Sequence, residues 1–267
     1  MAVIRTGIMG ILNVTPDSFY DGGRFADIDR AFEHAMQMVS EGADIIDVGG
    51  ESTRPGSKFV SVGEEIDRVC PVIEKITRES AIPVSIDTTK SAVASEAVRC
   101  GARIINDISG LTFDPGIIRV AAENCTGLVV SHIRGVPENM QKNTSYDNLL
   151  QDILDFLKLS SESAVQSGVS RDKIIIDPGI GFGKSLEQNY VILNNIHRLR
   201  EIGFPVLIGL SRKSLIGKLY DSDEDRLPAT IALNAAAVLR GADIVRVHDV
   251  KAHRLALDSI DFLKSVD

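Results

Sequence analysis

The sequence is poor in the residue types that mark several classes of protein. It has no tryptophan, only 5% aromatic residues, and three cysteines, Cys70, Cys100 and Cys125, that form no CxxC pair. An odd number of widely spaced cysteines argues against a disulfide framework and a cysteine zinc site, and it suits a reducing compartment. The sequence contains no HExxH or HxH pattern, so it predicts no protein-caged zinc.

Long apolar runs and basic clusters are also missing. No stretch approaches the roughly 18 apolar residues of a membrane span, and the N-terminal MAVIRTGIMGILNV lacks the cleavage region of a signal peptide. The net charge is −8 without any block of Lys or Arg, which argues against a nucleic-acid surface. These absences predict a cytoplasmic protein that binds neither membrane nor nucleic acid. A pocket on an acidic protein can still be locally positive.

What is present is a regular alternation of two kinds of segment along 267 residues. The chain is 44% hydrophobic and 25% charged, which is ordinary for a globular protein and excludes disorder. Eight short runs are almost continuously apolar, as expected of strands buried on both faces. These predicted strands cover residues 8–13, 44–50, 83–87, 103–107, 127–132, 173–179, 205–211 and 243–249.

Amphipathic stretches with helical spacing follow the apolar runs. The predicted helices cover residues 29–41, 63–77, 90–99, 114–123, 146–166, 186–200, 225–240 and 250–263. Three of the helical runs are followed by glycines, Gly42, Gly101 and Gly241, where a left-handed residue would end a helix. Eight strand–helix units without a linker predict an α/β protein with one (β/α)8 TIM-barrel domain over residues 1–267. An open doubly wound sheet is the alternative fold.

Almost every predicted strand ends in a polar side chain. The series is Asn13, Asp47 with Glu51, Asp87, Asn106 with Asp107, His132, Asp177, Ser211 with Arg212 and Lys213, and Arg246 with His248 and Asp249. In a parallel barrel these ends open on one face, where the active sites of barrel enzymes lie. Burying such groups unpaired is costly, so we expect them to contact each other or a ligand.

The segment DPGIGFGKS (177–185) is the most informative of these strand ends. Pro178 stands where a phosphate-binding P-loop needs glycine, so the Walker interpretation fails. The Asp177 carboxylate could accept two N–H groups from the edge of a heterocyclic ring, or it could form a structural salt bridge. Phe182 is either a pocket wall or a core residue.

Cationic residues follow the last two predicted strands. Lys213 could form a Schiff base, donate a hydrogen bond to a ligand carbonyl, or be a solvated loop lysine. Arg246 and His248 could hold an anion such as a pyrophosphate together with Asn13, with Mg²⁺ as a further partner. His248 alone would also fit a structural role.

Two long connections follow the first two predicted strands. The segments 13–25 and 50–59 exceed typical βα loops, and such loops often act as lids that bring in a second substrate. Arg54 would suit a carboxylate on that substrate.

Seven motifs link the sequence to a known family. They are MGILNVTPDSFYDGG (9–23), GADIIDVGGESTRPGS (42–57), PVSIDTTK (83–90), INDISG (105–110), DPGIGFGK (177–184), GLSRKSLIG (209–217) and RGADIVRVHD (240–249). They span nearly the whole chain, and in them the sequence resembles the dihydropteroate synthases of folate biosynthesis. The resemblance implies a homodimeric TIM-barrel transferase that uses Mg²⁺ with the pyrophosphate. It also implies condensation of 6-hydroxymethyl-7,8-dihydropterin pyrophosphate with p-aminobenzoate to 7,8-dihydropteroate and pyrophosphate, with sulfonamides competing for the p-aminobenzoate site.

The resemblance also assigns roles to individual residues. Pterin binding would fall to Asp87, Asn106, Asp177, Phe182 and Lys213; pyrophosphate binding to Asn13, Arg246 and His248, with Asn13 also next to the metal; and p-aminobenzoate binding to Phe19, Thr53, Arg54, Pro55 and Ser214. The catalytic residues would be Asp17, Asp87 and Lys213, with Asp17 near the methylene that becomes cationic. Because an aniline amine is a usable nucleophile, the reaction needs no covalent intermediate, and we favour Lys213 as a binding residue.

Three positions depart from the family pattern. Tyr20 replaces a serine in the first loop, and Ser131 and Ile133 replace methionines in the fifth strand. A serine at 131 is smaller and more polar than methionine, so it could loosen the pterin pocket. Two other functions stay open on the sequence alone: a pterin-binding methyltransferase barrel and a non-catalytic pterin-binding paralogue.

Overall fold

The strands form a closed parallel barrel in the computed structural model, which describes residues 5–15, 23–52, 57, 59–217 and 226–266. The eight strands are β1 (Gly7–Asn13), β2 (Ile45–Gly49), β3 (Val84–Asp87), β4 (Ile104–Asp107), β5 (Gly127–Ser131), β6 (Ile174–Asp177), β7 (Leu207–Gly209) and β8 (Ile244–Val247). Their order in the sheet is β6-β5-β4-β3-β2-β1-β8-β7, and a parallel bridge between Ile176 and Val206 joins the two ends. The predicted TIM barrel is therefore confirmed, and the doubly wound alternative, which would reverse its strand order, is wrong.

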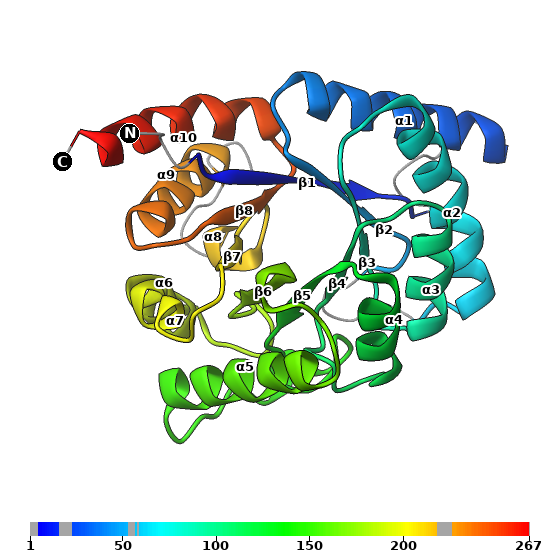
Figure 1. Cartoon of the computed structure of the whole chain (residues 1–267). Coiled ribbons are helices and arrows are strands. Elements are labelled where there is room, and N and C mark those ends of the chain that lie inside the picture. The colour runs from blue at the N-terminus through cyan, green and yellow to red at the C-terminus, as the bar shows by residue number, and fades with distance from the viewer. Residues whose placement is uncertain (1–4, 16–22, 53–56, 58, 218–225, 267) are drawn as a thin grey trace.

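Helices surround the barrel on its outside (Figure 1). They are α1 (Gly23–Ser40), α2 (Val62–Glu79), α3 (Ser91–Arg99), α4 (Gly116–Asn124), α5 (Leu149–Gln166), α6 (Leu186–Asn194), α7 (Ile196–Arg200), α8 (Ser214–Gly217), α9 (Arg226–Leu239) and α10 (Val250–Ser265). The predicted helix ends at Gly42, Gly101 and Gly241 are confirmed, since φ is between 99° and 112° at all three. Within the described ranges, no helix combines the length and the apolar character that crossing a membrane requires.

Most helices begin and end within three residues of their predicted bounds, and two predictions differ more strongly. The structure begins α1 at Gly23 rather than at residue 29, and Ile28 already packs against the core. The stretch 186–200 is divided into α6 and α7 at Asn195. The Asn195 side chain donates to the Val191 carbonyl at 2.8 Å, so it competes with the backbone hydrogen bonds that would continue the helix.

The barrel interior is built in layers, and the layers nearer the amino ends of the strands are mainly apolar. Met9, Val129 and Leu207 pack there with four isoleucines, which are Ile45, Ile104, Ile175 and Ile244. Because side chains alternate between the two faces of a strand, the residue two positions after each isoleucine also points inward. Those four residues are Asp47, Asn106, Asp177 and Arg246. The next layer towards the carboxyl ends of the strands is therefore entirely polar.

Candidate active site

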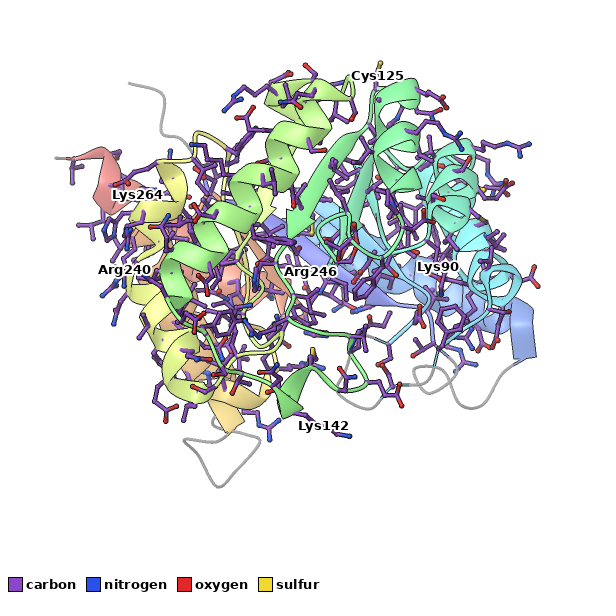
Figure 2. The ribbon with its side chains drawn as sticks, turned by 90° about the horizontal axis from the view of Figure 1, so that it is seen from below. Lys90, Cys125, Lys142, Arg240, Arg246 and Lys264 are labelled. Atoms are coloured by element: carbon purple, nitrogen blue, oxygen red, sulfur yellow. The ribbon has the colours of Figure 1, made fainter. Side chains whose placement is uncertain are left out.

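Arg246 connects the polar layer across the barrel. Its Nε donates to Asp47 Oδ2 at 2.6 Å and its Nη2 donates to Asp87 Oδ2 at 2.6 Å. Asn106 donates its amide to the same Asp47 oxygen at 3.0 Å. Figure 2 places Arg246 near the centre of the molecule, between Cys125 at one end of the barrel and Lys142 at the other. Four of the strand ends predicted to meet therefore do so.

Burial and charge act in opposite directions in this cluster. Burial raises the pKa of the Asp87 carboxyl to about 7, although the Arg246 guanidinium opposes the shift. Burial alone would lower the pKa of Arg246, but Asp47 and Asp87 outweigh it and hold that pKa above its usual value. Arg246 therefore stays cationic, and it retains further N–H donors for an anion because a guanidinium carries five.

Asp177 and Lys213 form the second part of the polar layer. Asp177 is 7% exposed, and its Oδ1 accepts the Gly179 N–H at 2.7 Å. Among the described residues, no further donor reaches this carboxylate. Lys213 donates to the Ile180 carbonyl and lies 4.4 Å from the centre of the Phe182 ring. The site thus presents a carboxylate acceptor beside a cationic donor and an aromatic face.

Lys213 titrates within an accessible pH range. Burial lowers its pKa from 10.5 to about 8, with Asp177 opposing the shift. If its ammonium group donates to a pterin carbonyl, the contribution of Lys213 to pterin affinity should be constant below pH 8. Above that pH, binding must take up a proton and should weaken by up to about tenfold per pH unit. Fluorescence titration of a pterin against pH measures this slope.

A Lys213→Met variant is the control for that titration. It lacks the titrating ammonium, so any slope that remains belongs to the ligand or to another residue. A wild-type affinity that stays flat well above pH 8 would contradict the role of Lys213 as a charged donor.

An apolar wall flanks the polar layer on the β4 and β5 side. Ile108, Ile133 and Met140 form a buried cluster, and Phe182 packs against it. Ile133 therefore keeps an apolar side chain where the family has methionine. Ser131 is buried beside Asp177 in the β5–β6 register, and its hydroxyl has no partner within the described part of the chain.

Asn13 and His248 lie at the mouth of the barrel. Ser211 Oγ lies 2.9 Å from His248 Nδ1 and accepts the His248 backbone N–H at 3.2 Å, which orients the imidazole. Asn13 Oδ1 and Asp87 Oδ2 lie 3.7 and 3.8 Å from the same point, the position that a Cβ on Gly49 would occupy. Among the described residues, no group of three or more His, Cys, Asp or Glu side chains could hold a metal. Mg²⁺ in phosphate sites needs only one or two protein oxygens, since substrate phosphates and water supply the rest. Asn13 Oδ1 is an oxygen of the required kind, whereas Asp87 Oδ2 already accepts from Arg246.

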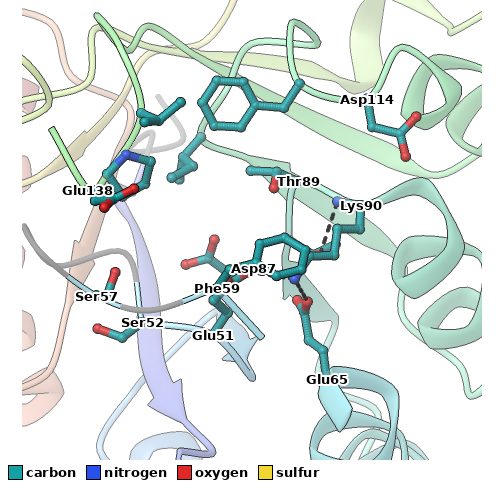
Figure 3. Close-up of a pocket in the computed structure, with 15 residues that line it drawn as sticks. Glu51, Ser52, Ser57, Phe59, Glu65, Asp87, Thr89, Lys90, Asp114 and Glu138 are labelled. Atoms are coloured by element: carbon teal, nitrogen blue, oxygen red, sulfur yellow. Dashed lines mark hydrogen bonds and ion pairs between the residues drawn. The ribbon is translucent and has the colours of Figure 1, made fainter. Parts of the chain in front are cut away.

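A cavity of about 470 Å³ opens beside Asp87, and Lys90 lies at its edge. The Lys90 ammonium donates to Glu51 and Glu65 carboxylates, each at 2.6 Å, and to the Val60 carbonyl at 2.7 Å. Figure 3 shows Lys90 and Glu65 pointing toward one another beside Phe59, whose ring centre is 4.3 Å from the ammonium. Lys90 therefore holds together residues from both ends of the second long loop.

Replacing Lys90 by methionine should lower the free energy of unfolding by about 3–5 kcal/mol, because a fully buried Glu65 would lose its cation. Urea unfolding measures the change. The matched control is Lys75→Met, since Lys75 pairs with the exposed Asp29 at 2.5 Å and should cost less than about 1 kcal/mol. A Lys90→Met effect no larger than that of the control would contradict the structural role of this pair.

Asp17, Phe19, Thr53, Arg54 and Pro55, together with Tyr20, lie outside the described residues. Ser214 begins α8, and its side chain is not described. The assignment of the p-aminobenzoate site stays a prediction.

The sequence interpretation missed three contributors to this region. Asp47 was noted as a strand end but given no role, although it accepts from both Arg246 and Asn106. Lys90 and Lys184 were given no role either. Their position at the ends of the PVSIDTTK and DPGIGFGK motifs was the only available signal, and it says nothing about where a flexible side chain will point.

Comparison with known proteins agrees with this geometry. The pterin binding enzyme family matches residues 9–248. The dihydropteroate synthase of Clostridium beijerinckii is 48% identical over 261 residues, which cover 97% of this chain and 94% of that protein.

Two solved structures share the fold closely. The dihydropteroate synthase of Clostridium difficile, solved with pteroic acid, is 46% identical with a TM-score of 0.92, covering 98% of this chain and 97% of that one. The enzyme of Xanthomonas albilineans, solved with 4-aminobenzoic acid, is 40% identical with a TM-score of 0.92, covering 100% and 96% of the two chains. Family, fold and transferase class predicted from the sequence are confirmed. This chain belongs to the pterin binding enzyme family and, within it, to the dihydropteroate synthases.

Proposed function

We propose that the polar layer at the barrel mouth binds 6-hydroxymethyl-7,8-dihydropterin pyrophosphate and that the protein joins it to p-aminobenzoate. The observation that carries this proposal is the buried Asp177 carboxylate beside Lys213. A pterin presents an amino group and a ring N–H side by side, next to a ring carbonyl. A carboxylate and an ammonium match these three groups.

The remaining pterin contacts follow from the same layer. Asn106 in β4 and Asp87 in β3 lie two and three strands away from Asp177 in β6, and we assign them to another edge of the same ring. Phe182, with the Ile108 and Ile133 cluster behind it, supplies an apolar face for the flat ring. Such a slot excludes water, which strengthens each polar contact inside it.

The leaving group is held by the cationic side of the mouth. Arg246 and His248, with Asn13, are positioned to bind the pyrophosphate as its C–O bond breaks. Asn13 would hold Mg²⁺ together with the substrate phosphates, and the ion would supply positive charge for the leaving pyrophosphate. The methylene becomes electron-poor as its C–O bond to the pyrophosphate breaks. The p-aminobenzoate nitrogen then forms the new C–N bond, and the proton that this nitrogen loses passes to water. Asp17 is proposed to stabilise the charge on the methylene, while Phe19, Thr53, Arg54, Pro55 and Ser214 receive p-aminobenzoate.

The resemblance also supports three properties beyond the reaction. We propose that sulfonamides compete with p-aminobenzoate at this site, that the protein is a homodimer, and that it acts in the cytoplasm.

Incubation of the purified protein with both substrates and Mg²⁺, followed by mass spectrometry, tests this function. Formation of dihydropteroate that requires p-aminobenzoate is expected. A parallel incubation with borohydride tests the role of Lys213, which should remain unmodified. Methyl transfer to a corrinoid with no dihydropteroate formed would overturn the proposal.

A further inference from the structure

Lys184 is a buried lysine that the proposed reaction does not use. It ends the glycine-rich loop between β6 and α6 and is only 2% exposed. Burial lowers its pKa well below the usual value, while Asp177 opposes the shift. A lysine side chain loses much conformational freedom when buried, so its hydrogen bonds must compensate.

The Lys184 amino group is surrounded by backbone carbonyls of its own β6–α6 loop. It donates to the Gly179 carbonyl at 2.9 Å and to the Phe182 carbonyl at 3.0 Å. It also lies 2.9 Å from Nδ1 and 3.3 Å from the backbone carbonyl of His132, at the end of β5. Burial lowers the pKa of His132 to about 3, so this imidazole is neutral and its Nδ1 can accept. Lys184 therefore ties the loop to itself and to the neighbouring strand.

The loop can follow this path only because of its glycines. Gly179 has φ of 67°, and a Cβ there would lie 1.8 Å from the His132 carbonyl oxygen. The carbonyls of Gly181 and Gly183 point elsewhere and accept from Gln141 and Tyr146. The Gly179 and Phe182 carbonyls point towards Lys184, whereas the Ile180 carbonyl points towards Lys213 and accepts from it.

The pterin-facing groups depend on that arrangement. The Gly179 N–H holds Asp177, the Ile180 carbonyl receives Lys213, and the Phe182 ring lies against the same ammonium. Asp177, Lys213 and Phe182 are therefore all connected to the loop that Lys184 holds, although nothing in the proposed reaction requires Lys184 to touch substrate.

We infer that Lys184 is a positioning residue for pterin recognition: its hydrogen bonds to the Gly179, Phe182 and His132 groups set the geometry of Asp177, Lys213 and Phe182. This inference rests on the proposed function. It assigns Lys184 to the pterin side of the site only, because its contacts with the described residues are to its own loop and to His132.

The test compares Lys184→Met with Lys173→Met. Lys173 is a matched control, since it also donates to a backbone carbonyl, that of Cys125 at 2.6 Å, but at the opposite end of β6. Lys184→Met should raise the pterin Kd and the KM for dihydropterin pyrophosphate by about tenfold or more, because the loop carbonyls lose their donor. In Lys184→Met the KM for p-aminobenzoate should stay within about twofold of wild type. In Lys173→Met the pterin Kd and the KM values for both substrates should match wild type.

A second variant covers the case in which Lys184→Met does not fold. Lys184→Ala leaves space for propylammonium, which can replace the three N–H donors, whereas tetramethylammonium has none. Recovery of pterin binding with propylammonium alone is expected. Pterin affinity within twofold of wild type in a folded Lys184→Met, equal losses for both substrates, or equal effects of the two cations would overturn the inference. Failure of the wild-type protein itself to bind a pterin would instead refute the proposed function.

Discussion

Replacing Asp177 by asparagine should weaken pterin binding by about 100-fold or more, since two ligand N–H groups would lose a charged acceptor. The carboxylate is buried, and its Oδ1 already accepts the Gly179 N–H at 2.7 Å. An asparagine keeps the volume of the side chain, but its amide would present N–H groups to a donor. Isothermal titration with a pterin, together with the KM for dihydropterin pyrophosphate, measures the loss.

Asp172→Asn is the control for this substitution. Asp172 lies before β6, whereas Asp177 is the last residue of that strand. The Asp172 carboxylate is exposed and accepts a hydrogen bond from the Ser170 hydroxyl. Asp172→Asn should leave pterin affinity unchanged. Pterin affinity within threefold of wild type in a folded Asp177→Asn would mean that the ring does not bind at the centre of the barrel.

Replacing Arg246 by methionine should lower the free energy of unfolding by about 3–5 kcal/mol, because Asp47 and Asp87 would be left buried without their cation. That is a large share of the roughly 5–15 kcal/mol by which proteins are stable. Urea unfolding measures it. Arg246→Lys should lose less free energy of unfolding than Arg246→Met, because it keeps the positive charge. A single ammonium group cannot, however, reproduce the planar guanidinium that bridges the Asp47 and Asp87 carboxylates. The turnover of Arg246→Lys should therefore fall by about 100-fold or more.

Arg240→Met is the stability control, since Arg240 lies at the surface (Figure 2), directly after α9, and donates to the carbonyl of Ala236 in that helix. It should change the free energy of unfolding by less than about 0.5 kcal/mol. Adding Asp47→Asn to Arg246→Met should recover part of the lost stability, because it removes one of the unpaired charges. If the double variant were less stable than Arg246→Met alone, charge pairing would not explain the effect.

The fold was accessible from the sequence because the barrel repeats one local pattern. Almost every strand is a short apolar run with a polar residue at or near its carboxyl end, and isoleucine precedes an inward-facing polar residue by two positions in β2, β4, β6 and β8. That spacing puts both on the same face of a strand. An apolar run followed by a polar residue is a weak signal alone, but its repetition along the chain predicts that Asp177, Asn106 and Arg246 lie at one end of the barrel.

The rest of the site was not accessible for a physical reason. Arg246, Lys90 and Lys184 have long side chains whose partners come from segments far apart in sequence, such as Asp47 and Asp87 for Arg246. Sequence pattern and spacing predict the face on which a side chain begins. They do not predict which of several carboxylates a long cationic side chain will pair with. The division of residues 186–200 at Asn195 was hidden for a related reason, because the apolar spacing continues through the break.

Pyrophosphate release by the purified protein is the most direct test of the central claim, that the barrel mouth activates a pterin pyrophosphate for attack by an arylamine. The assay contains dihydropterin pyrophosphate and Mg²⁺, with and without p-aminobenzoate. We expect release that depends on p-aminobenzoate, is matched by dihydropteroate formed, and disappears in Asp177→Asn but not in Asp172→Asn. Pterin binding without any release, or release that Asp177→Asn leaves unchanged, would contradict the claim.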